Sequence, residues 1–356
     1  MSIAAIADYM VDEYFDWRGI AQPEPLSARI TVNIDGLSAE NAALARQAMA
    51  LWEEVADIVF VETTGSAVIT YSDDRTSGAT TYRNDGAIVI SIANGRPLKS
   101  YIHETGHALG LGHTGPYNGT AVWGQDNLFS DDTRQWSVMS YFSQDQNGSG
   151  SDSIPVTPQM ADIMAIQSIY GAPASSNAGD TIYSPKVGTA MTLYDTDGRD
   201  TIDCSAYTGP QTLSVACGSL SSVMGGRNNL YIASNTKIEV VYGGAGDDEL
   251  IGGAGKNTMN GGGGADTFYF AADIKRLKGD RIGDFDRKEG DIIDLFAIDA
   301  KKGGSDNTFT YIGDESFSKK GEVSFHNGKL KLNTDNDHGA EAVMFLNTDP
   351  PSQALL

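Results

Sequence analysis

The 356-residue sequence predicts an α+β protein with two domains, a mixed α/β domain over residues 1–172 and an all-β domain over residues 173–356. Two observations support this division. Before Gly171, segments with strand-like alternation and segments with helical spacing of apolar residues follow one another. After Gly171, short β-type segments are separated by Gly, Asn and Asp, and a nine-residue repeat appears. The second domain is therefore expected to be repetitive and almost free of helices.

The elements of the first domain follow from apolar spacing and from helix-boundary residues. Residues 29–34 alternate as a half-buried strand does, and Ser38 offers an N-cap to the helical pattern that follows. Three short strands are expected at 67–71, 79–82 and 87–92. A last helix is expected from Thr157, with Pro158 in its first turn and Gly171 just past its end.

Composition restricts the class of partner. Asp and Glu total 47 against 25 Lys and Arg, and the resulting net charge of −22 opposes binding to nucleic acid or anionic lipid. No run approaches the roughly 18 to 20 apolar residues that cross a bilayer, and the acidic start lacks the basic residues of a signal peptide. We therefore expect no nucleic acid partner, no membrane anchor and a monomer, with calcium as the better-suited partner.

Cys204 and Cys217 lie 13 positions apart in the β-rich half. Adjacent strands could join them in a disulfide, or they could be two separate small thiols, and the sequence leaves both alternatives open. Neither has the spacing of a metal site or a redox pair.

One segment, HETGHALGLGH, contains an HExxH motif extended by xxGxxH. Positions i and i+4 share one face of a helix, so His103 and His107 are expected to converge on one metal while Glu104 points beside it toward a water molecule. Gly110 can end the helix with a positive φ, which returns the chain so that His113 supplies a third nitrogen. Three imidazoles leave a coordination position of Zn²⁺ for water, the pattern of a catalytic site. We predict one catalytic Zn²⁺ with Glu104 as the general base.

A methionine-containing turn, SVMSY, follows at residues 137–141. HExxHxxGxxH followed by such a turn is the metzincin signature. HETGHALGLGHTGPYN, DDTRQWSVMSYFS and the later glycine repeats together resemble the serralysin family of calcium-dependent bacterial metalloproteases, over nearly the whole chain. The resemblance implies a metzincin catalytic domain followed by a parallel β-roll or β-sandwich domain. It also implies that Met139 forms an apolar floor beneath the zinc and that Tyr141 is a switchable zinc ligand that can bind the oxyanion.

The sequence departs from the family pattern at Thr105, where a bulky aliphatic residue is usual, and at Thr114, where proline is usual. The stretch from Tyr71 to His103 is also shorter than in the family, which bears on substrate preference. If the family's arrangement holds, residues 79–82 form the edge strand on which an extended peptide lies by β-augmentation.

The glycine repeat, GGxGxDxUx with U a large apolar residue, occurs three times, over residues 243–251, 252–260 and 261–269. Two repeats make one turn of a parallel roll, whose interior we expect to be filled by Leu250, Met259 and Phe268. Repeats 18 residues apart stack on one side, so Asp248 and Asp266 should clamp one Ca²⁺. Asn257 weakens the middle repeat, so few calcium ions are expected. The carbonyl ligands predicted for the roll calcium are Gly244, Gly246, Gly261 and Gly263.

A second group of acids occupies residues 195–200, and residues 179–181 could lie alongside. It resembles the inter-domain calcium site of the family, and a solvated acidic turn is the alternative. The ligands expected there are Gly179, Thr181, Asp195, Asp197 and Asp200.

These features predict a secreted, calcium-stabilised zinc metalloendopeptidase that acts on protein and peptide substrates. The alternative from another class is a calcium-dependent binding or adhesive protein built on a protease scaffold. The resemblance implies bacterial type I secretion, with residues 349–356 as a loose match to the family's C-terminal signal. Whether a protein inhibitor caps the cleft stays an open question. Residues 1–20 could be an activation segment or a helix on the second domain.

Overall fold

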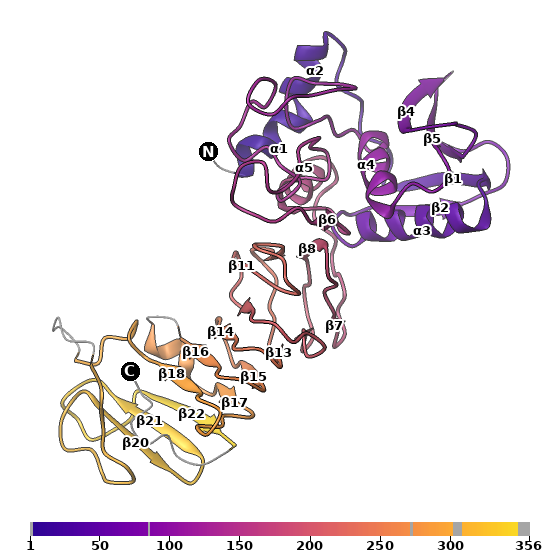
Figure 1. The fold of residues 1–356 in the computed structure, drawn as a ribbon. Coiled ribbons are helices and arrows are strands. Elements are labelled where there is room, and N and C mark those ends of the chain that lie inside the picture. Colours follow the sequence, from indigo (N-terminus) through magenta and orange to yellow (C-terminus); the bar gives the residue numbers. More distant parts are fainter. Residues whose placement is uncertain (1–2, 85, 271–272, 302–307, 348–356) are drawn as a thin grey trace. The chain divides into compact units, whose positions relative to one another are not determined.

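The computed structural model describes residues 3–84, 86–270, 273–301 and 308–347 (Figure 1). Its contacts divide the chain into two compact units: unit 1 is residues 1–176 with 188–194, and unit 2 is residues 177–187 with 195–356. Unit 1 therefore extends to residue 176 and also includes a strand from later in the chain, within residues 188–194. Residues 349–356, the expected C-terminal signal, lie outside the described part. None of the helices that the structure describes is long and apolar enough to cross a membrane.

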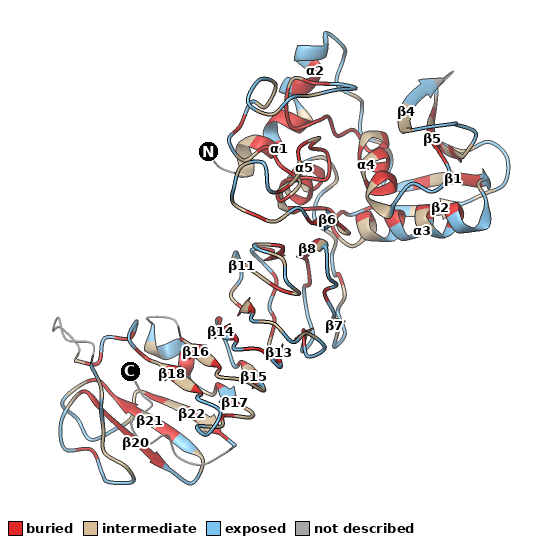
Figure 2. Ribbon diagram, in the orientation of Figure 1, coloured by how far each residue is buried: buried red, intermediate tan, exposed pale blue. Residues whose placement is uncertain are grey.

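Unit 1 is built on a mixed five-stranded sheet in the order β2-β1-β3-β5-β4. Its strands are β1 (Arg29–Gly36), β2 (Val59–Glu62), β3 (Ile69–Ser72), β4 (Ala79–Asn84) and β5 (Ala87–Ile92). All neighbours pair in parallel except β4, which runs antiparallel to β5. Strand β4 is thus one of the two edge strands, and most of it is coloured as half-buried or exposed in Figure 2.

The helices of unit 1 are α1 (Ile3–Val11), α2 (Glu13–Arg18), α3 (Ala39–Glu53), α4 (Leu98–Ala108) and α5 (Met160–Tyr170). Ser38 caps α3 as expected, because its Oγ accepts a hydrogen bond from Asn41 N. The predicted start of the last helix at Thr157 is wrong. A reciprocal capping box between Gln159 and Asp162 sets the start at Met160. The short strand β6 (Ile154–Pro155) precedes α5 and pairs in parallel with β8 (Thr189–Leu193).

Unit 2 is rich in β structure and is organised as a parallel roll. One sheet contains β7 (Ile182–Tyr183), β9 (Thr201–Asp203), β13 (Val240–Gly244), β15 (Thr258–Gly262) and β17 (Arg281–Ile282). A second sheet contains β10 (Thr212–Ser214), β14 (Glu249–Ile251), β16 (Thr267–Tyr269) and β18 (Ile292–Asp294). Leu250 pairs with Phe268 and Val241 with Met259, both 18 residues apart. Leu250, Met259 and Phe268 are fully buried, as the repeat pattern predicts.

The rest of unit 2 contains further short strands. The remaining strands are β11 (Leu220–Ser221), β12 (Leu230–Ile232), β19 (Thr310–Tyr311), β20 (Glu322–His326), β21 (Lys329–Asn333) and β22 (Ala342–Leu346), and a 3₁₀ turn, η1, spans Ile274–Leu277. Strands β20 to β22 pair antiparallel. Cys204 is a buried free thiol and Cys217 an exposed one, so the structure has no disulfide between them. The α+β composition with a β-rich C-terminal region agrees with the sequence prediction.

Candidate metal centre and active site

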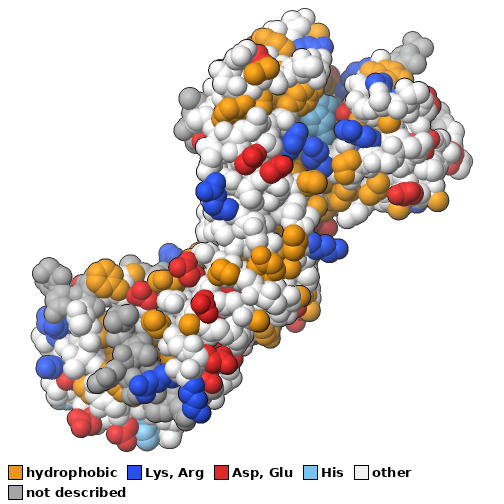
Figure 3. Space-filling model, in the orientation of Figure 1, with side chains coloured by type: hydrophobic (Ala, Val, Ile, Leu, Met, Phe, Trp, Pro, Cys, Tyr) orange, Lys and Arg blue, Asp and Glu red, His pale blue; other side chains and the backbone are white. Residues whose placement is uncertain are grey.

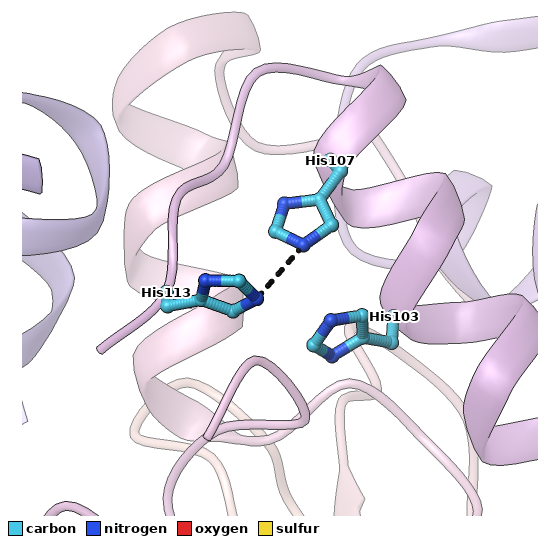
Figure 4. A group of neighbouring side chains, drawn as sticks. All are labelled: His103, His107 and His113. Carbon is cyan, nitrogen blue, oxygen red and sulfur yellow. Dashed lines mark hydrogen bonds between the residues drawn. The ribbon is translucent and has the colours of Figure 1, made fainter. Parts of the chain in front are cut away.

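Three histidines converge in unit 1 from two parts of the chain (Figure 4). His103 and His107 lie one turn apart on α4, and His113 lies on the irregular segment that follows the helix. One ring nitrogen of each lies within 4.8 Å of the others, and the Nε2 atoms of His107 and His113 are 3.1 Å apart. The chain reverses after α4 at Gly110. The φ of this residue is +106°, a backbone conformation that favours glycine.

In each histidine, the Nδ1 atom is hydrogen-bonded to a backbone carbonyl oxygen. The distances are 2.8 Å from His103 to Val138 O, 2.8 Å from His107 to Leu111 O and 3.0 Å from His113 to Tyr117 O. Because a carbonyl oxygen only accepts, Nδ1 carries the proton and Nε2 keeps its lone pair. Burial lowers the pKa of His103 to about 3 and that of His113 well below its usual value, which keeps these two rings neutral. Three imidazoles with converging Nε2 lone pairs fit Zn²⁺.

Glu104 lies on the same helix and is buried. Its Oε2 accepts a hydrogen bond from Thr81 Oγ1 at 2.7 Å, and the same hydroxyl lies 2.9 Å from the Glu104 carbonyl oxygen. Among the described residues, no donor contacts Oε1. Burial raises the pKa of this carboxyl, and the nearby His107 and the Thr81 hydroxyl lower it in part. This arrangement suits a carboxylate base in which Oε2 is held by a hydrogen bond and Oε1 can accept a proton.

The segment with the predicted methionine turn packs against α4. Met139 is fully buried, and a Cβ placed on Gly106 would lie 2.8 Å from the Met139 sulfur. The ring centroid of Tyr141 is 4.5 Å from that of His113. The Tyr141 hydroxyl accepts a hydrogen bond from Gly119 N at 3.1 Å, which leaves its proton available to another acceptor.

Asp248 and Asp266 occupy adjacent coils of the roll in unit 2. Asp248 N donates to Asp266 Oδ1 at 2.9 Å, and the Asp248 carboxylate accepts hydrogen bonds from Gly244 N at 2.6 Å and Gln211 N at 2.7 Å. Burial raises the pKa of Asp266 to about 7, and the neighbouring acids Asp291 and Asp248 add to the shift. A bound cation would offset this cost of holding a buried carboxylate.

The predicted carbonyl ligands lie where the coils of the roll approach each other, at Gly244, Gly246, Gly261 and Gly263. A Cβ on Gly262, whose φ is +103°, would lie 1.8 Å from Gly244 O, and one on Gly264 would lie 2.7 Å from Gly246 O. Gly263 N donates to Gly244 O at 2.9 Å, and Gly261 N donates to Asp284 Oδ1 at 3.0 Å. Gly262 and Gly264 are therefore required by the close approach of the backbones.

The structure reveals further acids in the same ladders, at Asp280 and Asp291. Asp266 N donates to Asp291 Oδ1 at 3.0 Å, and Asn257 N donates to Asp280 Oδ1 at 2.9 Å. Each of these acids stands two positions before a buried isoleucine, as Asp248 stands two positions before a buried leucine. The nine-residue period missed them because their spacing is irregular, whereas the triplet Asp-x-apolar would have found them.

The second predicted calcium group is assembled within unit 2. Thr181 N donates to Asp200 Oδ1 at 2.9 Å, Thr181 Oγ1 donates to Gly179 O at 3.0 Å, and Asp197 N donates to Asp195 Oδ1 at 3.2 Å. Burial raises the pKa of Asp200 to about 6. Residues 179–181 and 195–200 thus lie side by side. Among the described residues, the three carboxyls do not form a group within 4.8 Å of one another.

One acidic group lies outside the predicted sites, at Asp335, Asp337 and Glu341, whose carboxylates come within 4.8 Å of one another. Glu341 accepts a hydrogen bond from Thr334 N at 2.5 Å. Such groups also occur on acidic protein surfaces without a metal, and we assign this one no function.

Comparison with known proteins agrees with this geometry. The family described as Peptidase M10 serralysin C terminal matches residues 161–348. The chain belongs to the serralysin family. Serralysin C of Dickeya chrysanthemi is 32% identical over 63% of this chain and 57% of its own length. Serralysin of Photorhabdus laumondii is 31% identical over 59% of this chain and 52% of its own length. Metalloprotease AprA of Pseudomonas entomophila is 36% identical over 42% of this chain and 35% of its own length.

The chain spans about half the length of these serralysin relatives. Among solved structures, that of myroilysin is 16% identical with a TM-score of 0.31, covering 45% of this chain and 97% of its own. The AlgE6R3 subunit of the Azotobacter vinelandii mannuronan C5-epimerase is 21% identical with a TM-score of 0.27, covering 52% and 81%. At these TM-scores neither defines the fold of this chain.

Both departures from the serralysin pattern have polar partners in the structure. The Thr105 hydroxyl donates to Tyr101 O at 2.6 Å and lies 2.7 Å from the Tyr71 hydroxyl. The Thr114 hydroxyl contacts Asp132, and it lies 2.6 Å from the Tyr117 hydroxyl. Each buried hydroxyl is therefore satisfied, which makes these substitutions compatible with a folded site.

Sequence reasoning missed Asp162, which holds the methionine turn in place. It accepts hydrogen bonds from Ser137 Oγ at 2.5 Å, Val138 N at 2.8 Å and Gln159 N at 2.7 Å. Burial raises its pKa to about 7, and these hydrogen bonds oppose the shift. Because Val138 O binds His103 Nδ1, Asp162 links α5 to the metal centre. The only sequence signal was its place in the first turn of a helix.

Residues of the two N-terminal helices form part of the site. Helix α1 packs against α5 in unit 1, and the Tyr14 hydroxyl on α2 lies 3.1 Å from His113 Nδ1. A Cβ on Gly112 would lie 2.2 Å from the Tyr14 ring, so the glycine makes room for the tyrosine. The residues between 1 and 20 that the structure describes therefore pack on the catalytic side, an arrangement that the sequence did not indicate.

A cleft opens onto the three histidines from two sides. One side is lined by β4, α2 and the metal site, and the other by β4, the start of α4 and the methionine turn. His103, Glu104, Tyr141 and Ala79 line both. In Figure 3, histidine surface lies in a hollow of unit 1 with Lys and Arg side chains beside it.

Proposed function

We propose that this chain is a zinc metalloendopeptidase. The observation that supports this best is the set of three histidines whose Nδ1 atoms are tied to carbonyls, with the buried Glu104 beside them. His103, His107 and His113 would hold one Zn²⁺ through Nε2. When bound, this ion supplies Lewis acid chemistry that acidifies water and polarises a carbonyl group. The metalloprotease names of the relatives support the same assignment.

Glu104 is the proposed general base. Its Oε1 is free to take a proton from the attacking water, while Oε2 stays on the Thr81 hydroxyl. The raised pKa favours uptake of the proton from the attacking water, because the conjugate base of a weaker acid binds a proton more readily. The protonated carboxyl can then pass this proton to the leaving amine. Two proton transfers on one oxygen need no movement of the helix.

Tyr141 is the proposed oxyanion partner, with zinc ligation in the resting site as its second role. Its hydroxyl accepts from Gly119 N, so its own proton can be donated to a developing oxyanion. Its ring lies 4.5 Å from that of His113, so its hydroxyl would be close to a zinc held by the three histidines.

An extended peptide is the proposed substrate form. Strand β4 pairs with β5 on one side only, and Ala79, Thr80, Thr81, Tyr82 and Arg83 line the cleft. The free edge can hydrogen-bond a peptide backbone and place it across Glu104. Backbone pairing is tolerant of side-chain identity, so we expect many proteins to be cleaved.

Calcium is the proposed structural ion of unit 2. The buried ladder of Asp248 and Asp266 supports one roll site, with Gly244, Gly246, Gly261 and Gly263 as carbonyl ligands. A second site would use Gly179, Thr181, Asp195, Asp197 and Asp200. We further propose that the protein works outside the bacterial cell as a monomer after type I secretion, since calcium is abundant there and the roll requires it.

The test is hydrolysis of casein by the zinc- and calcium-loaded protein and by its Glu104→Gln variant. We expect the variant to bind one zinc per chain and to lose about 10²- to 10⁴-fold in kcat. Glu24→Gln, an exposed acid of unit 1, is the matched control and should keep full activity. Full activity in zinc-loaded Glu104→Gln would refute the mechanism. A folded, zinc-loaded wild type that cleaves no peptide library would favour the binding or adhesive alternative.

A further inference from the structure

The charge of the cleft is opposite to that of the chain. Of 25 Lys and Arg residues, five line the two sides of the cleft, whereas of 47 Asp and Glu residues only Glu104 does so among those described. Arg18 and Arg83 lie on the side of α2. A chain of net charge −22 would not gather cations at its catalytic cleft by composition alone.

Three of these cations line one side of the cleft. We call this side the cationic pocket, and its basic residues are Arg96, Lys99 and Arg134. Arg96 and Lys99 stand at the beginning of α4, and Arg134 precedes the methionine turn. None of the three forms an ion pair with a described carboxylate. The Nε atom of Arg134 is buried without a hydrogen-bond partner, although its Nη2 donates to Tyr141 O at 2.8 Å.

This placement is unfavourable for the isolated protein. The N-terminus of a helix carries partial positive charge and favours acids, yet the first turn of α4 has none and contains Lys99. Burial lowers the pKa of Lys99 to about 8, and the charges of Arg134 and Arg96 lower it further, opposed by the exposed Asp152. Unpaired, partly buried cations that repel one another are a local cost that proteins accept mainly at functional sites.

We propose that the cationic pocket binds the carboxylate side chain of an Asp or Glu that flanks the cleaved bond of the substrate. This inference rests on the proposed peptidase function and adds its substrate preference. The pocket includes His103, Glu104 and Tyr141, so it adjoins the reacting carbonyl, and an extended chain advances only about 3.3 Å per residue. The neighbouring residue is therefore the one whose side chain enters it. A carboxylate there would be paired with Lys99, beside the charge of Arg134.

The first test uses blocked peptides in which a single residue flanking the cleaved bond is Glu or the isosteric Gln. With zinc and calcium bound, we expect kcat/KM to be about tenfold higher for the Glu peptide at one of the two flanking positions. The ratio should fall as NaCl rises from 50 to 500 mM, because screening weakens partly exposed pairs. Equal kcat/KM for Glu and Gln at both positions would overturn the proposal.

Variants locate the effect. Lys99→Gln should reduce the Glu-to-Gln ratio severalfold, and Lys99→Arg should keep most of it, since charge and reach are retained. Arg29→Gln, an exposed cation of unit 1 away from the cleft, is the matched control and should leave the ratio unchanged. An unchanged ratio in Lys99→Gln together with Arg134→Gln would contradict the assignment of the pocket.

A binding measurement separates this inference from the proposed function. Calorimetry with the zinc-loaded Glu104→Gln protein gives Kd for the Glu and Gln peptides without turnover. Tighter binding of the Glu peptide supports the pocket even if the wild type cleaves neither peptide, an outcome that would refute the peptidase. Cleavage of both peptides with equal rates and equal Kd would refute the pocket alone.

Discussion

Glu104 owes its orientation to one hydroxyl on the edge strand. Thr81 Oγ1 lies 2.7 Å from Oε2 and 2.9 Å from the Glu104 carbonyl oxygen. The contact joins β4, the proposed peptide-binding edge, to the proposed base on α4. A peptide that pairs with β4 therefore touches the same strand that positions the catalytic carboxylate.

Replacing Thr81 by Val should lower kcat by about tenfold, because a hydrogen bond to a charged group contributes about 1.5–3 kcal/mol. The variant keeps the shape of the side chain and loses the hydroxyl. The acidic limb of the pH profile should also move to higher pH, since the hydroxyl lowers the pKa of Glu104. Thr81→Ser should retain most of the activity. Steady-state kinetics across pH check this, and an unaltered profile in Thr81→Val would argue against a positioning role.

Between α4 and β6, residues 109–153 contain no helix or strand, yet they include His113, Met139 and Tyr141. At the scale of elements, this irregular segment is held by buried polar contacts to the regular ones. Asp162 on α5 fixes the methionine turn, and the Tyr14 hydroxyl on α2 contacts His113. Two helices therefore position the parts of the site that no helix or strand contains.

Asp162→Asn should lower the free energy of unfolding of unit 1 by about 2 kcal/mol, because an amide nitrogen would replace an oxygen that accepts buried hydrogen bonds. Zinc affinity should fall as well, since Val138 O orients His103. Urea unfolding and zinc titration measure the two effects. Asp57→Asn, an exposed acid of unit 1, serves as the control and should match the wild type in both.

The roll presents a second element-scale feature, its ladder of buried acids. Asp266 and Asp280 each have a pKa raised to about 7, mainly by burial. Without calcium, the folded state binds protons that the unfolded state has released above its ordinary carboxyl pKa near 4. The calcium-free stability of unit 2 should therefore fall as pH rises from about 4 to 7.

Thermal unfolding in a calcium chelator, followed from pH 4 to 8, measures this trend. The Tm of unit 2 should decline through the window and should recover when calcium is added at pH 7.5. A Tm that rises with pH in the chelator would mean that these carboxyls are not destabilising when ionised.

At the scale of the whole molecule, two units of different construction share a chain of net charge −22. Unit 1 has a sheet with helices and the proposed zinc site, whereas unit 2 buries a ladder of acids in its roll. Each unit has its own core, so loss of calcium should act on unit 2 first. A cation bound to the folded roll alone stabilises it by mass action.

Asp248→Asn should raise the calcium concentration needed to protect the amides of β13 to β16 from hydrogen exchange by about tenfold, since one carboxylate ligand is lost. The amides of α3 and β1 should exchange as in the wild type. Asp314→Asn, an exposed acid of unit 2, removes the same charge and should have no effect. Equal shifts in both variants would point to general charge rather than to a site.

The motif spacing predicted the residues of the candidate site better than it predicted the contacts that hold these residues in place. HExxHxxGxxH places two histidines one helical turn apart and a glycine where the chain must reverse, so local geometry alone brings His103, His107 and His113 together. The repeat period likewise predicted the 18-residue register of Leu250 and Phe268. Such features depend on residues close in sequence, whose relative positions the backbone itself fixes.

The supporting contacts depended on residues distant in sequence. Thr81 reaches Glu104 across 23 positions, Tyr14 reaches His113 across 99, and Val138 O lies 35 positions from His103. No local pattern encodes such a pairing, because an exposed-looking Thr or a helical Tyr is equally suited to many neighbours. The sequence by itself determined the convergence of the three histidines, the resemblance to the family and the periodic roll. Only the tertiary structure decided which hydroxyls, carbonyls and cations surround them, since packing brings these groups together.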